Sequence, residues 1–101
     1  VEYMAPEYIE SFILNEKTDM YALGIMMFEM LCGQPPFVGR QRDVMKKQVK
    51  EQPYRPSELS EKKIPKWLDD LIAAMLAKDP EDRPTNALVV GKALLARRYP
   101  A

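Results

Sequence analysis

Residues 18–37 read TDMYALGIMMFEMLCGQPPF and contain a long apolar run. Between Met20 and Cys32 the only charged residue is Glu29, and the apolar side chains show no preferred side. This pattern predicts a helix that is buried on all sides rather than one that lies on a surface. The run is too short to span a bilayer, which needs about 20 apolar residues.

The ends of this helix are marked by their residue types. Thr18 is placed to cap the free N–H groups, and Asp19 puts a negative charge at the positive end of the helix dipole. Gly33, followed by Pro35 and Pro36, stops the helix. We therefore expect it to begin at Thr18 and to end just before Gly33.

The rest of the chain predicts further helices and no strand. Helical spacing of apolar residues indicates a surface helix over residues 65–77 and a thin amphipathic helix over residues 41–52 that covers the core. Thr85 is expected to cap a final helix that ends near Arg97. One side of this helix carries Leu88, Gly91 and Leu95, with Val90 and Leu94 beside them. The predicted architecture is all-α, with amphipathic helices packed about one apolar helix.

Composition excludes several classes of function. The chain of 101 residues has 15 basic and 15 acidic side chains and no histidine. A net charge of zero gives no overall attraction to nucleic acid or anionic lipid, so we expect neither as a partner. The single cysteine, Cys32, allows no internal disulfide, and without histidine there is no Cys-His or Ser-His pair and no ordinary zinc site. Cys32 is best interpreted as a small buried apolar residue.

Three short motifs occur in register: YMAPE at residues 3–7, DMYALG at residues 19–24 and DPEDRPT at residues 79–85. Together they resemble the C-terminal lobe of a protein kinase. They correspond to the Ala-Pro-Glu end of the activation segment, the Asp-x-Trp-x-x-Gly start of the central F helix, with Tyr21 in place of Trp, and the Arg-bearing turn between the last two helices. The resemblance covers residues 1–101 and implies one partial kinase domain, C-lobe only. A bacterial-type eukaryotic-like kinase is one candidate.

The resemblance also implies roles for individual residues. Glu7 and Arg83 are expected to form a buried ion pair that ties the end of the activation segment to the helical floor. A guanidinium suits this role because its planar fork holds a carboxylate in a fixed orientation. Asp19 is expected to anchor the catalytic loop by accepting backbone hydrogen bonds from it, and to be only partly satisfied without that loop.

The first residues resemble the loop that seats the substrate residue following the phosphorylated one. This implies substrate contacts for Val1, Glu2, Tyr3 and Met4. Tyrosine kinases typically have Trp at the position of Tyr3, whereas Ser/Thr kinases typically have Tyr. The resemblance therefore favours Ser/Thr specificity.

The parts that a kinase uses for phosphoryl transfer do not occur in this sequence. There is no Gly-rich phosphate loop, no catalytic loop with its Asp and Asn, and no Asp-Phe-Gly metal ligand. We therefore expect no catalytic, cofactor-binding or metal-binding residue in this segment. ATP and Mg²⁺ would bind elsewhere in the parent kinase, and the expected partners are its N-lobe, its catalytic segment and a protein substrate.

The sequence begins with Val1 and shows no signal or transit peptide, so we expect a piece of a longer cytoplasmic protein. The resemblance leaves two main hypotheses open. One is a Ser/Thr kinase whose catalytic half lies upstream, and the other is a pseudokinase-like module that binds a partner through residues 41–52 and the adjoining loops. An unrelated helical domain is disfavoured. Lys46, Lys47 and Lys50 could form a basic patch, but with acidic residues between them a solvated face is the preferred interpretation.

Overall fold

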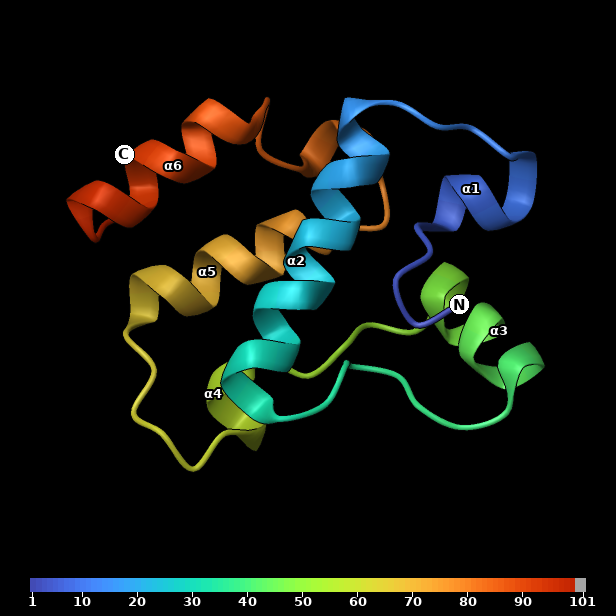
Figure 1. Cartoon of the computed structure of the whole chain (residues 1–101), viewed down its shortest axis with the longest axis horizontal. Coiled ribbons are helices and arrows are strands. Elements are labelled where there is room, and N and C mark those ends of the chain that lie inside the picture. The colour runs from blue at the N-terminus through green and yellow to red at the C-terminus, as the bar shows by residue number, and fades with distance from the viewer. Residues whose placement is uncertain (100–101) are drawn as a thin grey trace.

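The computed structural model describes residues 1–99 and shows an all-helical domain, as predicted (Figure 1). No strand occurs in this part of the chain. Helix α2 crosses the middle of the molecule, with α5 and α6 on one side and α1 and α3 on the other. The helices are α1 (Pro6–Ser11), α2 (Glu16–Cys32), α3 (Gln41–Lys50), α4 (Pro56–Leu59), α5 (Lys66–Met75), the 3-10 helix η1 (Pro80–Asp82) and α6 (Ala87–Ala96). None of those within residues 1–99 combines the length and the apolar character that a membrane crossing needs.

Helix α2 begins earlier than predicted, because Asn15 and not Thr18 is its N-cap. The Asn15 Oδ1 accepts hydrogen bonds from the backbone N–H groups of Lys17 at 2.9 Å and Thr18 at 3.2 Å. The Thr18 hydroxyl in turn accepts from the Asn15 N–H at 3.3 Å, which completes a capping box. At the other end Gly33 adopts φ 83°, the left-handed conformation expected of a glycine that ends a helix.

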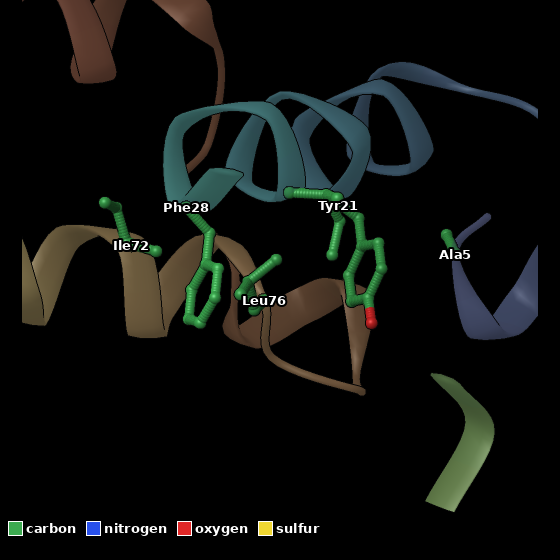
Figure 2. Close-up of a cluster of buried hydrophobic side chains, with 6 residues drawn as sticks. Ala5, Tyr21, Phe28, Ile72 and Leu76 are labelled. Carbon is green, nitrogen blue, oxygen red and sulfur yellow. The ribbon is translucent and has the colours of Figure 1, made fainter. Parts of the chain in front are cut away.

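Helix α2 is buried on one side and exposed on the other towards its C-terminus. Its buried side forms the main core cluster, part of which is drawn in Figure 2. This cluster contains Ala5, Tyr21, Ile25, Phe28, Ile72 and Leu76. Met26 is 51% exposed and Met30 is 74% exposed. The prediction of burial on all sides is therefore wrong, because no element within residues 1–99 covers these two side chains.

Helix α5 supplies most of the surface on which α2 packs. It is slightly shorter than predicted, and Pro65 is its N-cap rather than its first helical residue. Its Asp69 is buried but paired, since the carboxylate accepts hydrogen bonds from the Ser57 N–H at 2.9 Å and the Ser57 hydroxyl at 2.8 Å. These bonds attach the short helix α4 to α5.

Helix α3 packs against α1, away from the core between α2 and α5. Val44 is fully buried, as expected for the apolar stripe, whereas Met45 and Val49 are half-buried. Gln48 is also fully buried, one turn after Val44. The predicted cover helix is therefore present, with one polar side chain directed into the protein.

Helix α6 begins one residue later than the predicted cap requires. Asn86, not Thr85, is the N-cap, and its Oδ1 accepts a hydrogen bond from the Val89 N–H at 3.1 Å. Asn and Thr are both preferred N-cap residues, so composition alone does not separate the two positions. The helix ends at Ala96, and Arg97 adopts a left-handed conformation with φ 55°.

The side of α6 that packs on the domain differs from the side marked by its leucines. Val90 and Ala93 are buried, whereas Leu88 is 65% exposed and Leu95 is 89% exposed. Nearly every residue of this helix is apolar, so the sequence pattern does not select one face. The small Ala93 and the β-branched Val90 form the contact, with Leu71 and Met75 of α5 in the same cluster.

The close approach of α2 to α5 predicts a strong effect of Gly24→Ala. A Cβ at Gly24 would lie 2.9 Å from the Met75 Cβ and 3.0 Å from the Leu76 Cδ2. The added methyl group must push α5 away from α2, so we expect a loss of about 1–3 kcal/mol in the free energy of unfolding. Urea unfolding followed by far-UV circular dichroism measures this loss.

Gly91→Ala is the matched control, because a Cβ at Gly91 would meet nothing within 4 Å. In the middle of α6, alanine is expected to stabilise the protein by up to about 1 kcal/mol. Equal stabilities of the two variants would contradict the close packing at Gly24.

Candidate functional site

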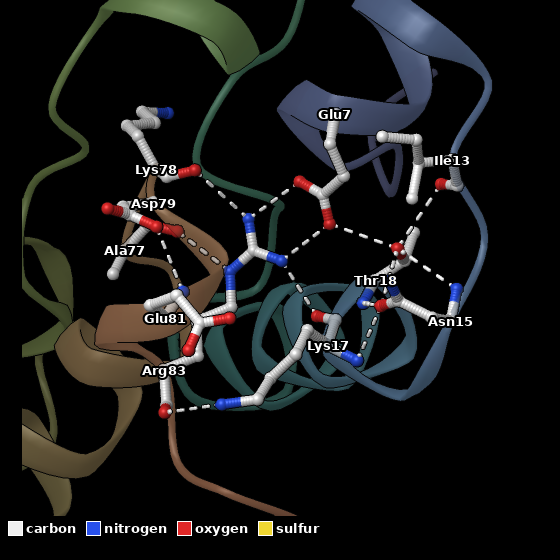
Figure 3. Close-up of polar contacts among 10 residues, drawn as sticks. All are labelled: Glu7, Ile13, Asn15, Lys17, Thr18, Ala77, Lys78, Asp79, Glu81 and Arg83. Atoms are coloured by element: carbon white, nitrogen blue, oxygen red, sulfur yellow. Dashed lines mark hydrogen bonds and ion pairs between the residues drawn. The ribbon is translucent and has the colours of Figure 1, made fainter.

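Arg83 lies directly after η1, and its side chain is fully buried. It binds the Glu7 carboxylate through both terminal nitrogens: Nη1 donates to Oε2 at 2.7 Å and Nη2 donates to Oε1 at 2.9 Å (Figure 3). It also donates to three backbone carbonyls, from Nε to Ala77 at 2.8 Å, from Nη1 to Lys17 at 2.7 Å and from Nη2 to Lys78 at 3.3 Å. A guanidinium has five N–H donors, so every donor of Arg83 has an acceptor.

Glu7 lies in the first turn of α1 and is the acidic partner of this pair. Its side chain is 11% exposed, and Oε2 accepts a further hydrogen bond from the Thr18 hydroxyl at 3.0 Å. Burial raises the pKa of Glu7, but the hydrogen bonds from Arg83 and Thr18 and the Arg83 charge together lower it below its ordinary value of 4.5. The pair therefore remains ionised at neutral pH and holds α1 against the start of α2.

Tyr21 lies beneath the Arg83 side chain and connects the ion pair to α3. The guanidinium carbon lies 4.9 Å from the centre of the Tyr21 ring, which allows a cation–π contact. The ring is fully buried, and its hydroxyl donates a hydrogen bond to the Gln48 Oε1. Burial raises the pKa of Tyr21, so the hydroxyl keeps its proton at neutral pH. A Trp at this position could stack on Arg83 but has no hydroxyl.

Gln48 joins helix α3 to the first residues of the chain. While its Oε1 accepts from Tyr21, its Nε2 donates to the backbone carbonyls of Glu2 at 2.7 Å and Val1 at 3.3 Å. Sequence reasoning missed Gln48 because a glutamine on a polar helix is normally solvated. The available signal was its four-residue spacing from the apolar Val44, which places both side chains on one face.

Lys78 is a second, half-buried cation near the ion pair. Its Nζ donates to the backbone carbonyls of Gln48 at 2.7 Å and Lys47 at 3.3 Å, in the last turn of α3. Burial and the charge of Arg83, only partly offset by Glu51, lower the pKa of Lys78 to about 8. Lys78 thus attaches the turn before η1 to α3.

The residues expected to seat substrate, Val1, Glu2, Tyr3 and Met4, form a short turn in which the Met4 N–H donates to the Val1 carbonyl at 3.2 Å. The Tyr3 hydroxyl donates a hydrogen bond to the Glu29 carboxylate on α2. This bond is the main cause of a raised pKa for Tyr3. Glu29 was not selected as a site residue, although it is the only charge in the apolar run of α2. The loop is therefore held on two sides, by α3 and by α2.

Asp19, the expected anchor of the catalytic loop, is exposed in the first turn of α2. Within residues 1–99 no hydrogen bond reaches its carboxylate, and it does not contact the Glu7–Arg83 pair. It borders a pocket of about 380 Å³ between α2 and α6, whose lining includes Met20, Leu23 and Leu88.

The side chains of this site hold segments of the chain in place through hydrogen bonds and an ion pair. The polar side chains pair with one another, Arg83 with Glu7, Tyr21 with Gln48 and Tyr3 with Glu29. In the part of the chain that the structure describes, no group of three or more His, Cys, Asp or Glu side chains could hold a metal ion. The arrangement can fix the N-terminal loop and α1 on the helical core.

Comparison with known proteins places this helical subdomain in a family. The sequence model of the protein kinase domain family matches residues 1–95 of the chain. The chain is 40% identical over 81 residues to the serine/threonine-protein kinase PknE of Mycobacterium tuberculosis. This alignment covers 80% of the chain and 14% of PknE. The chain is 36% identical over 87 residues to PknB of Mycobacterium leprae, covering 85% and 14%. A probable serine/threonine-protein kinase of Dictyostelium discoideum is 33% identical over 105 residues, covering 99% and 20%.

The chain therefore belongs to the protein kinase domain family, and the relatives named above are Ser/Thr kinases. The family assignment drawn from the three motifs is confirmed, as is the all-helical class. The chain spans 14–20% of the length of these relatives.

Removing the arginine of the ion pair is expected to be strongly destabilising. Arg83→Ala leaves the Glu7 carboxylate largely buried without its partner and removes the hydrogen bonds that Arg83 donates to three backbone carbonyls. We expect a loss of about 3–5 kcal/mol in the free energy of unfolding, measured by urea denaturation.

Lys66→Ala is the control for this variant. It removes an ion pair to Asp70 at 2.8 Å in which the lysine side chain is 87% exposed, so the expected loss is below about 0.5 kcal/mol. A loss below about 1 kcal/mol for Arg83→Ala would show that the buried pair does not hold the fold together.

The lowered pKa of Glu7 predicts a defined response to acid. The stabilisation of the fold by the Glu7 carboxylate is complete above pH 4.5, the pKa of this group in the unfolded chain. It is lost as the pH falls through the lower pKa that Glu7 has in the folded protein. Glu7→Gln cannot take up this proton, so its free energy of unfolding should fall less steeply with acidification than that of the unmodified protein. Urea denaturation at a series of pH values compares the two slopes, and parallel curves would contradict the assignment.

Proposed function

We propose that this chain is the helical floor of a Ser/Thr protein kinase, which transfers the γ-phosphoryl group of ATP to serine or threonine of a protein substrate. The observation that carries the proposal is the Arg83–Glu7 pair. It fixes residues 1–7, which match the end of the activation segment, against α2 and the turn after α5. In this proposal the segment seats substrate and braces the activation segment, and it is not catalytic by itself.

Substrate seating is assigned to Val1, Glu2, Tyr3 and Met4. The support for this role is that the loop is held in place before any substrate arrives, by Gln48 from α3 and by Glu29 from α2. A loop that is already ordered loses less conformational entropy when a peptide binds. Ser/Thr specificity rests on Tyr3, and it agrees with the relatives named above, which are Ser/Thr kinases.

Asp19 is proposed to anchor the catalytic loop. Its carboxylate is exposed at the N-terminal end of α2, where backbone N–H donors from another segment could reach it. The pocket beside it is lined mainly by apolar atoms of α2 and α6. We assign this surface to the rest of the kinase domain, which would also supply the sites for ATP and Mg²⁺.

The test uses the protein expressed from its complete gene, incubated with labelled ATP and peptides that differ only in having Ser, Thr or Tyr at the acceptor position. We expect label on Ser and Thr but not on Tyr. Gln48→Leu removes the bonds to Val1 and Glu2, and we expect it to raise the KM for the peptide about tenfold, equivalent to about 1.4 kcal/mol. The KM for ATP should stay unchanged, because Gln48 does not touch the nucleotide.

Gln52→Leu is the matched control, since Gln52 is exposed just after α3, and it should leave both KM values unchanged. The gene sequence upstream of Val1 separates the remaining alternatives. An Asp-bearing catalytic loop and an Asp-Phe-Gly triplet support the active kinase. Their absence, together with no label on any peptide, would replace this proposal by the pseudokinase-like interaction module.

A further inference from the structure

A groove of about 620 Å³ lies between α1 and α3. Its floor consists of three half-buried apolar side chains, Ile9, Met45 and Val49. The inward-facing residues of α3, Val44 and Gln48, are not part of it, so the groove uses a different face of the helix. This surface plays no role in the proposed substrate-seating function.

Three basic residues line the groove along α3: Arg42, Lys46 and Lys50. Their four-residue spacing places them in one row on the helix surface, where neighbouring like charges repel by about 0.2–0.5 kcal/mol per pair. All three are exposed, and none forms a salt bridge within residues 1–99. Two acidic residues lie at opposite ends of α3, Asp43 in its first turn and Glu51 at its C-cap, and neither lines the groove, although Glu51 lies beside Lys46 and Lys50 on an adjoining surface. The row is therefore a concentrated positive edge on a chain whose net charge is zero.

The combination of an apolar floor and a positive edge selects the chemistry of the occupant. An amphipathic helix can place apolar side chains on such a floor while carboxylates four residues apart, about 6 Å along its axis, run beside the basic row. A nucleic acid would use the positive charge but not the floor, which lacks the aromatic side chains on which bases stack. We propose that the α1/α3 groove docks an acidic amphipathic helix of a partner protein.

The test measures binding directly and requires no phosphoryl transfer, so it stands apart from the kinase assay. The protein expressed from its complete gene is titrated into a fluorescein-labelled helical peptide with leucines on one face and glutamates every four residues along its edge. Fluorescence anisotropy should show saturable binding. The same peptide with Gln in place of each Glu should bind at least about tenfold more weakly, because the charge contacts are lost.

Two sets of variants locate the site. The triple variant Arg42→Glu, Lys46→Glu and Lys50→Glu should weaken binding at least about tenfold, and so should Met45→Gln, which makes the floor polar. The control triple variant changes three exposed lysines elsewhere, and its affinity should match that of the unmodified protein. Its substitutions are Lys62→Glu, Lys63→Glu and Lys92→Glu. Unchanged far-UV circular dichroism shows that each variant has kept its helices.

Three results would overturn the proposal. One is no saturable binding of the glutamate peptide. Another is an equal loss of affinity in both triple variants, which would indicate attraction by total charge alone. The third is tighter binding of a single-stranded oligonucleotide with the same number of negative charges, which would make the groove a nucleic-acid site.

Discussion

The guanidinium of Arg83 ties together three segments that meet at the candidate site. Its five hydrogen bonds reach α1 through Glu7, the first turn of α2 through Lys17, and the turn after α5 through Ala77 and Lys78. These segments are separated by up to 76 positions in the sequence, so local structure does not bring them together. Burying a charge is costly unless it is paired and fully hydrogen-bonded, and both conditions are met here. An ammonium has only three donors and lacks the planar fork, so lysine would not replace this arginine.

From Arg83 a row of buried contacts leads to the N-terminal loop. The guanidinium stacks on Tyr21, Tyr21 donates to Gln48, and Gln48 donates to the carbonyls of Glu2 and Val1. Each of these contacts has a preferred direction. Within residues 1–99 no buried side-chain nitrogen or oxygen lacks a hydrogen-bond partner. A fully satisfied polar network selects one geometry more strongly than apolar packing does. The same contacts that stabilise the fold therefore also position the loop.

The sequence predicted the parts of this structure that depend on long apolar patterns and on recognisable motifs. The central helix was predicted from its apolar run and its end signals, and the surface helix α5 from the helical spacing of its apolar residues. The kinase motifs pointed to Glu7 and Arg83. Neighbouring residues with the same propensity were harder to separate, as with Asn15 and Thr18 at the start of α2. The buried Gln48 was missed because its burial depends on partners that are 27 or more positions away. Periodicity reports only local faces of a helix, so it carries no information on such pairings.

The α2/α6 surface and the α1/α3 groove differ in chemistry, and this difference separates the roles proposed for them. Between α2 and α6 the lining surface is mainly apolar and carries the exposed carboxylates of Glu16 and Asp19. Such a surface suits a segment that brings its own apolar side chains and backbone N–H donors, as a neighbouring part of the same fold would. Between α1 and α3 the apolar floor is bordered by three cations. A surface with that charge would repel the basic side chains of many segments and attract acidic ones, which gives it selectivity among partners. Gln48 on one face of α3 holds the N-terminal loop that is proposed to seat substrate. A helix docked in the groove would lie against the opposite face of α3.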